Sequence, residues 1–247
     1  MGYLELSKQE LEKEYGNLVK RFEEFKGMGL NLNMARGKPS KEQLDFSLPM
    51  LDTINSKSDF IGEDKMDCRN YGLLNGITEC RKLFADILGV DAENVIVGGS
   101  SSLNMMFDTI SCFMTAPAVE GCKPWYEVKN RKFLCPVPGY DRHFGITQYY
   151  GFELIPIPMD DNGPDMDMVE RLVSEDDSIK GIWCVPKYSN PAGTTYSDEV
   201  VKRFAALKPA AKDFRIMWDN AYCIHEISDT PDVLLNIMDE CKKTGNE

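Results

Sequence analysis

Polar side chains that could bind a ligand follow several apolar runs of this sequence. In "IMWDNAY" (216–222), Asp219 ends an apolar run and Tyr222 stands three residues later. A carboxylate at the end of a buried strand is costly to desolvate unless a cation or hydrogen-bond donors meet it. Asp219 could simply cap a helix, or it could meet a protonated ring nitrogen. In the second case, Tyr222 could offer its hydroxyl to an oxygen on the same ring.

A second candidate is the loop "VGGSSSLNMM" (97–106), which places Ser100, Ser101 and Ser102 at the start of an expected helix. Exposed N–H groups and the helix dipole favour an anion there, and the serine hydroxyls add further donors. The loop matches neither G-x-G-x-x-G nor the Walker A motif. Because serines also cap helices without binding anything, this loop alone does not distinguish a phosphate site from a cap.

Two further groups complete the set. Asn190, in the turn "SNPAG" (189–193), could donate an amide N–H to a ligand oxygen, although turn formation alone also explains this composition. Tyr140 follows the apolar stretch "KFLCPVPG" (132–139) and could supply a flat face on which a ring stacks.

The apolar periodicity predicts the elements that must position these groups. Strands are expected at 94–99, 132–137, 152–157, 179–186 and 214–219, and helices at 7–26, 77–88, 103–114, 164–174, 197–207 and 231–243. Strands separated by helices of this length predict an α/β fold with a mostly parallel sheet flanked by helices. Such sheets bind ligands outside the carboxyl ends of their strands, which is where all four polar groups stand.

Composition excludes several classes of protein. The 247 residues carry a formal net charge of −12 without a basic cluster, which argues against nucleic acid or an anionic membrane as a partner. No apolar run approaches the ~20 residues of a membrane span. The eight cysteines form no C-x-x-C pair and the chain has two histidines, so we expect reduced thiols in a cytoplasm and no metal site.

The motifs "GGSSSL", "PGY", "NPAG" and "DNAY", in this order, resemble the fold-type I pyridoxal-phosphate-dependent aminotransferases of class I/II. The chain is most similar to a bacterial, aspartate-aminotransferase-like branch. With "LNMARGKP" (32–39) and "NYGLLNG" (70–76), the resemblance covers nearly the whole chain. It implies an N-terminal arm and small-domain segment at 1–75 and an incomplete cofactor-binding large domain at 76–247.

The resemblance also implies a role for each residue of the set. Asp219 would pair with the pyridine nitrogen of pyridoxal 5′-phosphate, which keeps the ring protonated and electron-withdrawing. Tyr222 and Asn190 would hydrogen-bond the hydroxyl oxygen of the ring. Tyr140 would stack on the ring, and the three serines Ser100 to Ser102 would hold the phosphate.

Three residues nearer the start of the chain match other family positions. Tyr71 corresponds to the tyrosine that reaches the partner's phosphate, which implies a homodimer of the full-length protein. Gly37 corresponds to a glycine whose backbone lies near the substrate carboxylate. Arg36 could bind a second carboxylate or form a surface or interface salt bridge. The implied substrates are an amino acid, aspartate-like by branch, and a 2-oxo acid.

The sequence departs from the family at its catalytic centre. The Schiff-base lysine belongs to a Ser-x-x-Lys-like motif after DxAY, and nothing here matches it. Lys242 and Lys243 stand in an expected helix, and Lys187 precedes the asparagine turn at no catalytic position. The chain is therefore expected to be the front portion of a longer enzyme, truncated before that lysine and inactive by itself. The alternative is a lysine-less protein that binds the cofactor or a partner without catalysis.

The missing segment should also affect the sheet. In the family, the strands after DxAY lie between the strand before the phosphate loop and the strand that ends in the aspartate. We therefore expect a gap between residues 94–99 and 214–219, with unpaired edges on both sides.

Overall fold

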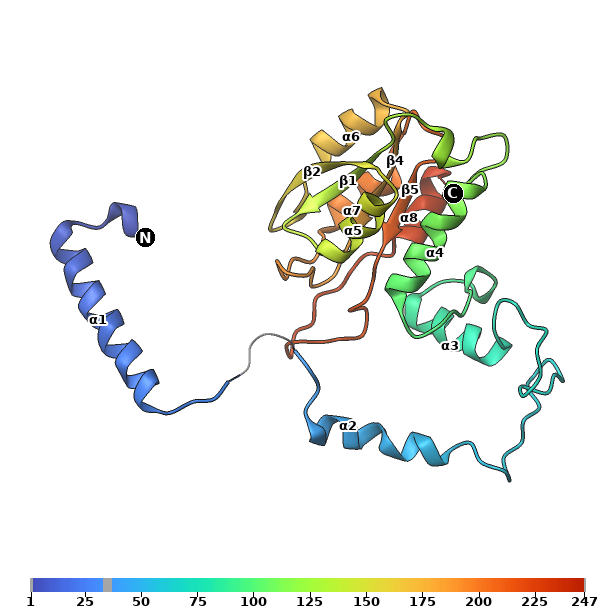
Figure 1. Ribbon diagram of the computed structural model, residues 1–247, viewed down its shortest axis with the longest axis horizontal. Coiled ribbons are helices and arrows are strands. Elements are labelled where there is room, and N and C mark those ends of the chain that lie inside the picture. The colour runs from blue at the N-terminus through green and yellow to red at the C-terminus, as the bar shows by residue number, and fades with distance from the viewer. Residues whose placement is uncertain (1, 33–36, 247) are drawn as a thin grey trace. The chain divides into compact units, whose positions relative to one another are not determined.

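The computed structural model describes residues 2–32 and 37–246 and divides the chain into two compact units, residues 1–59 and 60–247 (Figure 1). The predicted boundary lay at residue 75, and the assignment of residues 60–75 to the N-terminal arm stays a prediction. Within the described ranges, every helix is too short or too polar to cross a membrane.

The first unit is helical. Its elements are a 3₁₀ turn at Tyr3–Glu5, α1 (Lys8–Gly27), α2 (Lys41–Ser47) and a second 3₁₀ turn at Leu48–Asp52. The predicted capping box starts α1: Ser7 Oγ accepts from the Glu10 N–H, and Glu10 Oε2 accepts from the Ser7 N–H at 2.8 Å. No residue of α1 is buried, so the apolar face that the sequence predicts is uncovered in this unit.

The second unit alternates helices and strands. It contains α3 (Thr78–Leu88), α4 (Ser102–Thr115), β1 (Lys132–Val137), α5 (Asp141–Tyr149), β2 (Glu153–Asp160), β3 (Gly163–Pro164), α6 (Met166–Glu175), β4 (Ile179–Cys184), α7 (Asp198–Ala205), β5 (Arg215–Trp218) and α8 (Ile237–Thr244), with 3₁₀ turns at Ala92–Asn94 and Trp125–Glu127. The α/β fold with a mostly parallel sheet is confirmed.

The five strands form one sheet in the order β3-β2-β1-β4-β5. The pairs β1–β2, β1–β4 and β4–β5 are parallel, and the short β3 pairs antiparallel with β2. The interior strand β4, between β1 and β5, is buried along its whole length, whereas every residue of the edge strand β5 is half-buried. The carboxyl ends of β1, β4 and β5 therefore meet at one edge of the sheet.

Helices cover both faces of this sheet because side chains alternate along each strand. On β1, Leu134 packs in a cluster with residues of α6, α7 and α8. Its neighbours Phe133 and Cys135 belong to a second cluster, which contains residues of α4 and α5. On β4, Ile182 and Trp183 divide between the same two clusters. The result is a three-layer arrangement in which α4 and α5 lie opposite α6, α7 and α8.

The expected strand at 94–99 was wrong: after the 3₁₀ turn at Ala92–Asn94 these residues form neither helix nor strand. Val95 is buried, but Ile96 is 66% exposed. The Val97 N–H donates to the Asn75 carbonyl at 3.0 Å rather than to a strand. An apolar run forms a strand only when another strand pairs with it. Here β5 is the edge strand of the sheet, and it does not pair with residues 94–99. The expected unpaired edge is therefore present at β5, whereas residues 94–99 supply no second strand edge.

The last helix also differs from its prediction. It begins at Ile237 rather than at residue 231, because Asn236 provides the cap: its Oδ1 accepts from the Met238 N–H at 2.9 Å. The same side chain donates to the Gly89 carbonyl at 2.7 Å, which ties the start of α8 to the end of α3. Helices α2 and α5 were not predicted.

Candidate functional site

A pocket of about 340 Å³ opens at the carboxyl edge of the sheet, within the size range of small-molecule sites. It is lined by Ser100, Ser101, Ser102, Leu103, Tyr140, Val185, Asn190, Asp219, Ala221 and Tyr222. The structure thus brings together seven of the residues that the sequence singled out, from four separate stretches of the chain.

The serine loop forms one end of this pocket. Ser101 is the N-cap of α4, and its hydroxyl accepts from the Asn104 N–H at 3.3 Å. Gly98 lets the loop pack against the first turn of α4, because a Cβ there would lie 2.7 Å from the Met105 sulfur. The pocket wall at this end consists of three hydroxyl-bearing residues at the positive end of a helix dipole, which suits an anion.

Asp219 lies at the carboxyl end of β5. Its N–H donates to the Cys184 carbonyl at 2.8 Å, which extends the pairing between β4 and β5 by one residue. Its carboxylate Oδ2 lies 2.9 Å from His143 Nε2, and the Asp219 side chain is 12% exposed. The carboxylate is therefore held by a hydrogen bond on the protein side while the residue lines the pocket.

His143 on α5 was not predicted as part of this site; from the sequence it stood out only as one of two histidines that could help to bind a metal. It is buried, and its ring stacks on Trp183 with centroids 4.8 Å apart and planes 19° apart. The Trp183 N–H donates to Thr147 Oγ1 at 3.2 Å, so the tryptophan is itself fixed. The His143 ring also makes a T-shaped contact with Tyr140, which lines the pocket. Tyr140 and His143 are three residues apart in "YDRH", a spacing that would predict their contact only if a helix were expected there.

Asn190 and Tyr222 come from two loops. Asn190 is exposed in a turn after β4, which is closed by the Ser189 N–H donating to the Thr194 carbonyl at 2.9 Å. Gly193 has a φ of +75°, a conformation that glycine adopts without strain. Tyr222 is half-buried in the segment that follows β5.

The remaining predicted residues lie elsewhere. Tyr71 is 92% exposed and does not line the pocket. Gly37 is exposed in the first unit, and Arg36 lies outside the described residues. Lys187 is buried and paired with Glu226, so its amine does not line the pocket either.

Lys242 and Lys243 are also held away from the pocket, on α8. They form ion pairs with Asp91 and Glu240 respectively. The pocket wall therefore contains none of the three lysines Lys187, Lys242 and Lys243.

Two titratable groups close to the pocket are neutral near pH 7. Burial raises the pKa of the Cys184 thiol well above its usual range. Burial likewise raises the pKa of Tyr196 well above its usual value, and the nearby Cys184 adds to that effect. Cys184 directly precedes Val185 in the pocket wall.

These groups together favour one type of ligand. Hydroxyl groups and a helix start favour an anion at one end, and a carboxylate at the other favours a cationic nitrogen. Tyr140 offers an aromatic face, and Asn190 and Tyr222 can both hydrogen-bond an oxygen. The pocket therefore fits a flat ring that carries a phosphate, a protonated nitrogen and a ring oxygen.

Comparison with known proteins gives consistent matches. The family model described as aspartate amino-transferase matches residues 6–247. The aspartate aminotransferase of Corynebacterium glutamicum is 46% identical over 230 residues, which cover 93% of this chain and 53% of that relative. The chain spans about half the length of the curated relatives it matches.

Solved structures agree with the sequence matches. An aspartate transaminase structure from Corynebacterium glutamicum superimposes with a TM-score of 0.86 at 44% identity, covering 98% of this chain and 56% of that chain. An archaeal alanine:glyoxylate aminotransferase is 21% identical, with a TM-score of 0.58 over 91% of this chain and 53% of that chain, and thus shares the fold.

Proposed function

Because this chain belongs to the aspartate amino-transferase family, we propose that it is part of a pyridoxal-phosphate-dependent aminotransferase. The proposed reaction transfers an amino group between an aspartate-like amino acid and a 2-oxo acid. The aspartate preference is supported by the 46% identical relative, which bears the name aspartate aminotransferase.

The observation that carries this proposal is that seven residues from the family motifs line one pocket. In the bound state, pyridoxal phosphate would supply an electron-withdrawing ring that stabilises negative charge on the substrate carbon. Ser100 to Ser102 and the start of α4 would hold the phosphate, and Tyr140 would cover one face of the ring. Asn190 and Tyr222 would bind the ring oxygen.

Asp219 has the role that depends most on its surroundings. Its carboxylate would hold a proton on the pyridine nitrogen, which requires that the carboxylate be fixed in place and shielded from water. His143 fixes one carboxylate oxygen at 2.9 Å, and the stack on Trp183 fixes His143. Preorganised charge of this kind needs no reorientation during a reaction.

The proposed reaction also needs a lysine amine, and no lysine lines the pocket. The lysine is therefore assigned to the longer protein, and these 247 residues are expected to bind the cofactor without catalysing transamination. In that protein, Tyr71 would reach the phosphate held by a second subunit of a homodimer. Gly37 and Arg36 would contact the carboxylates of the substrate.

Titration of this chain with pyridoxal 5′-phosphate, followed by absorbance and tryptophan fluorescence, tests the proposal. Asp219→Ala should weaken binding at least about tenfold, which corresponds to about 1.4 kcal/mol. Competition by inorganic phosphate should be unchanged, because the phosphate end is intact. The matched control is Asp176→Ala, at the amino-terminal edge of β4, which should leave binding unchanged. Unaltered affinity in Asp219→Ala, or no binding by the unmodified chain, would contradict the assignment.

A further inference from the structure

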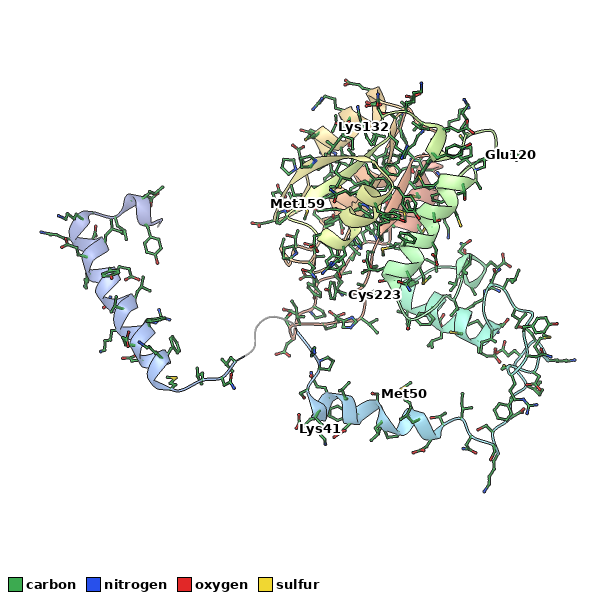
Figure 2. All side chains as sticks on the ribbon, in the orientation of Figure 1. Lys41, Met50, Glu120, Lys132, Met159 and Cys223 are labelled. Carbon is green, nitrogen blue, oxygen red and sulfur yellow. The ribbon has the colours of Figure 1, made fainter. Side chains whose placement is uncertain are left out.

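Lys187 is a buried lysine that the proposed function does not use. It follows β4 by three residues, and its residue surface is 5% exposed. Its Nζ lies 3.1 Å and 3.3 Å from the two carboxylate oxygens of Glu226 and 3.4 Å from the Cys223 carbonyl (Cys223 is labelled in Figure 2). A buried ammonium without a partner is strongly destabilising, so Lys187 restricts where Glu226 can lie.

The next residue makes a second connection between the same segments. The Tyr188 hydroxyl donates to Glu226 Oε2 at 3.4 Å and accepts from the Asp232 N–H at 3.0 Å. Tyr188 has a φ of +48°, which is uncommon for a residue other than glycine and is maintained only when surrounding contacts over-determine it. One such contact is the Tyr188 N–H, which donates to Thr195 Oγ1 at 3.2 Å.

These contacts connect the two loops that bear the proposed ligands of the ring oxygen. Lys187 and Tyr188 directly precede the turn that contains Asn190, and Glu226 follows Tyr222 by four residues. Residues 221–235 contain no helix or strand. Among the described residues, the side-chain hydrogen bonds that connect 221–235 to the segment after β4 come from Lys187 and Tyr188.

We propose that Lys187, Tyr188 and Glu226 form a clamp that holds Asn190 and Tyr222 at the spacing needed to bind one ring oxygen together. The three clamp residues are positioning residues, since none of them lines the pocket. This inference rests on the proposed function, because it assumes that Asn190 and Tyr222 share that oxygen.

If the clamp acts in this way, the pocket should bind a ligand with the ring oxygen more tightly than an analogue without it. Two donors fixed around one oxygen favour a ligand that carries it over an analogue that lacks it, because the analogue leaves both donors unpaired. If the segment that carries Tyr222 is released, each donor can satisfy itself elsewhere, and the discrimination falls while the phosphate contacts remain.

The test compares affinities for pyridoxal 5′-phosphate and for 3-deoxypyridoxal 5′-phosphate, which lacks the ring hydroxyl. The unmodified chain should prefer the first about tenfold, as expected for one to two net hydrogen bonds. Lys187→Met and Glu226→Gln should reduce this preference to about threefold or less. Tyr188→Phe, which removes only a hydroxyl from a half-buried ring, should give an intermediate value.

Lys180→Met is the matched control. Lys180 is 6% exposed, lies near the amino-terminal end of β4, the strand that Lys187 follows, and pairs with Asp213 at 2.7 Å. This variant removes the ion pair of a buried lysine whose partner side chain is 5% exposed, compared with 44% for Glu226, and it should keep the tenfold preference. A preference that stays at tenfold in Lys187→Met and Tyr188→Phe, or that falls equally in Lys180→Met, would overturn the clamp.

If the unmodified chain shows no preference between the two ligands, the assignment of Asn190 and Tyr222 in the proposed function fails, and the clamp fails with it. If the preference exists and the clamp variants keep it, the clamp alone fails.

Amide hydrogen exchange tests the clamp without any ligand. Lys187→Met should accelerate exchange at the Asp232 and Cys223 amides at least about tenfold, while the amides of β4 keep their protection. Unchanged exchange at both amides would show that the segment is held by other contacts and would overturn the proposal even for a variant that no longer binds the cofactor.

Discussion

The hydrogen bond between His143 and Asp219 should contribute measurably to stability even without a ligand. His143→Leu replaces the ring by a non-polar side chain of about the same size and leaves the carboxylate, 12% exposed, without its partner. Asp219→Ala removes the carboxylate itself, so the His143 ring loses its hydrogen-bond partner. A hydrogen bond to a charged group is worth about 1.5–3 kcal/mol, and most of that cost arises from the group left unpaired.

A double-mutant cycle isolates this interaction. The free energy of unfolding in urea is measured for the unmodified chain, both single variants and the double variant. We expect a coupling energy of about 1.5–3 kcal/mol, because the double variant leaves neither group unpaired. The control cycle uses Lys123 and Glu127, an ion pair of 3.8 Å in the same unit with side chains 77% and 38% exposed, and it should show little coupling. Equal coupling in the two cycles would refute the reasoning.

Two further expectations concern the sheet. Burial by itself would raise the pKa of the Asp176 carboxyl, but hydrogen bonds from Lys132 and Ser178 outweigh it and lower the pKa to about 2 from the ordinary 3.8. This stabilisation is present above pH 3.8 and is lost as the pH falls through 2. Asp176→Asn should therefore lower the free energy of unfolding, measured in urea, by about 1–2 kcal/mol more at pH 6 than at pH 2.5. Gly181→Ala should destabilise the protein by about 3 kcal/mol, because its Cβ would lie 2.5 Å from the Arg215 carbonyl oxygen in the central sheet; a thermal midpoint equal to that of the unmodified chain would contradict this.

The fold class could be predicted because each layer follows from local patterns. The capping box at Ser7 and the left-handed Gly89, with a φ of +65°, set helix ends through contacts a few residues apart. The apolar runs that became β1 and β4 are long enough to be buried on both faces. The sheet flanked by helices and the incomplete coverage of aminotransferase relatives agree with the resemblance.

Errors arose where a structure depends on a distant partner. Residues 94–99 have the composition of a strand, but a strand requires a neighbour, and none pairs with them in the described chain. The start of α8 depends on Asn236, whose side chain also contacts the end of α3, far away in sequence. The missing strand partner and the contact between Asn236 and Gly89 both lie outside a local window of residues, although the cap bond from Asn236 to Met238 is local.

For the candidate site, local sequence patterns predicted the aromatic ring, the amide and the carboxylate that follow β1, β4 and β5, and the serine loop at the start of α4. They could do so because parallel strands carry their functional side chains at their carboxyl ends, whatever the rest of the chain does. The contacts of His143 with Asp219 at 2.9 Å and of Lys187 with Glu226 at 3.1 Å could be found only from the folded chain. Those partners lie 76 and 39 residues apart, and packing of the helices and loops around the sheet brings them together.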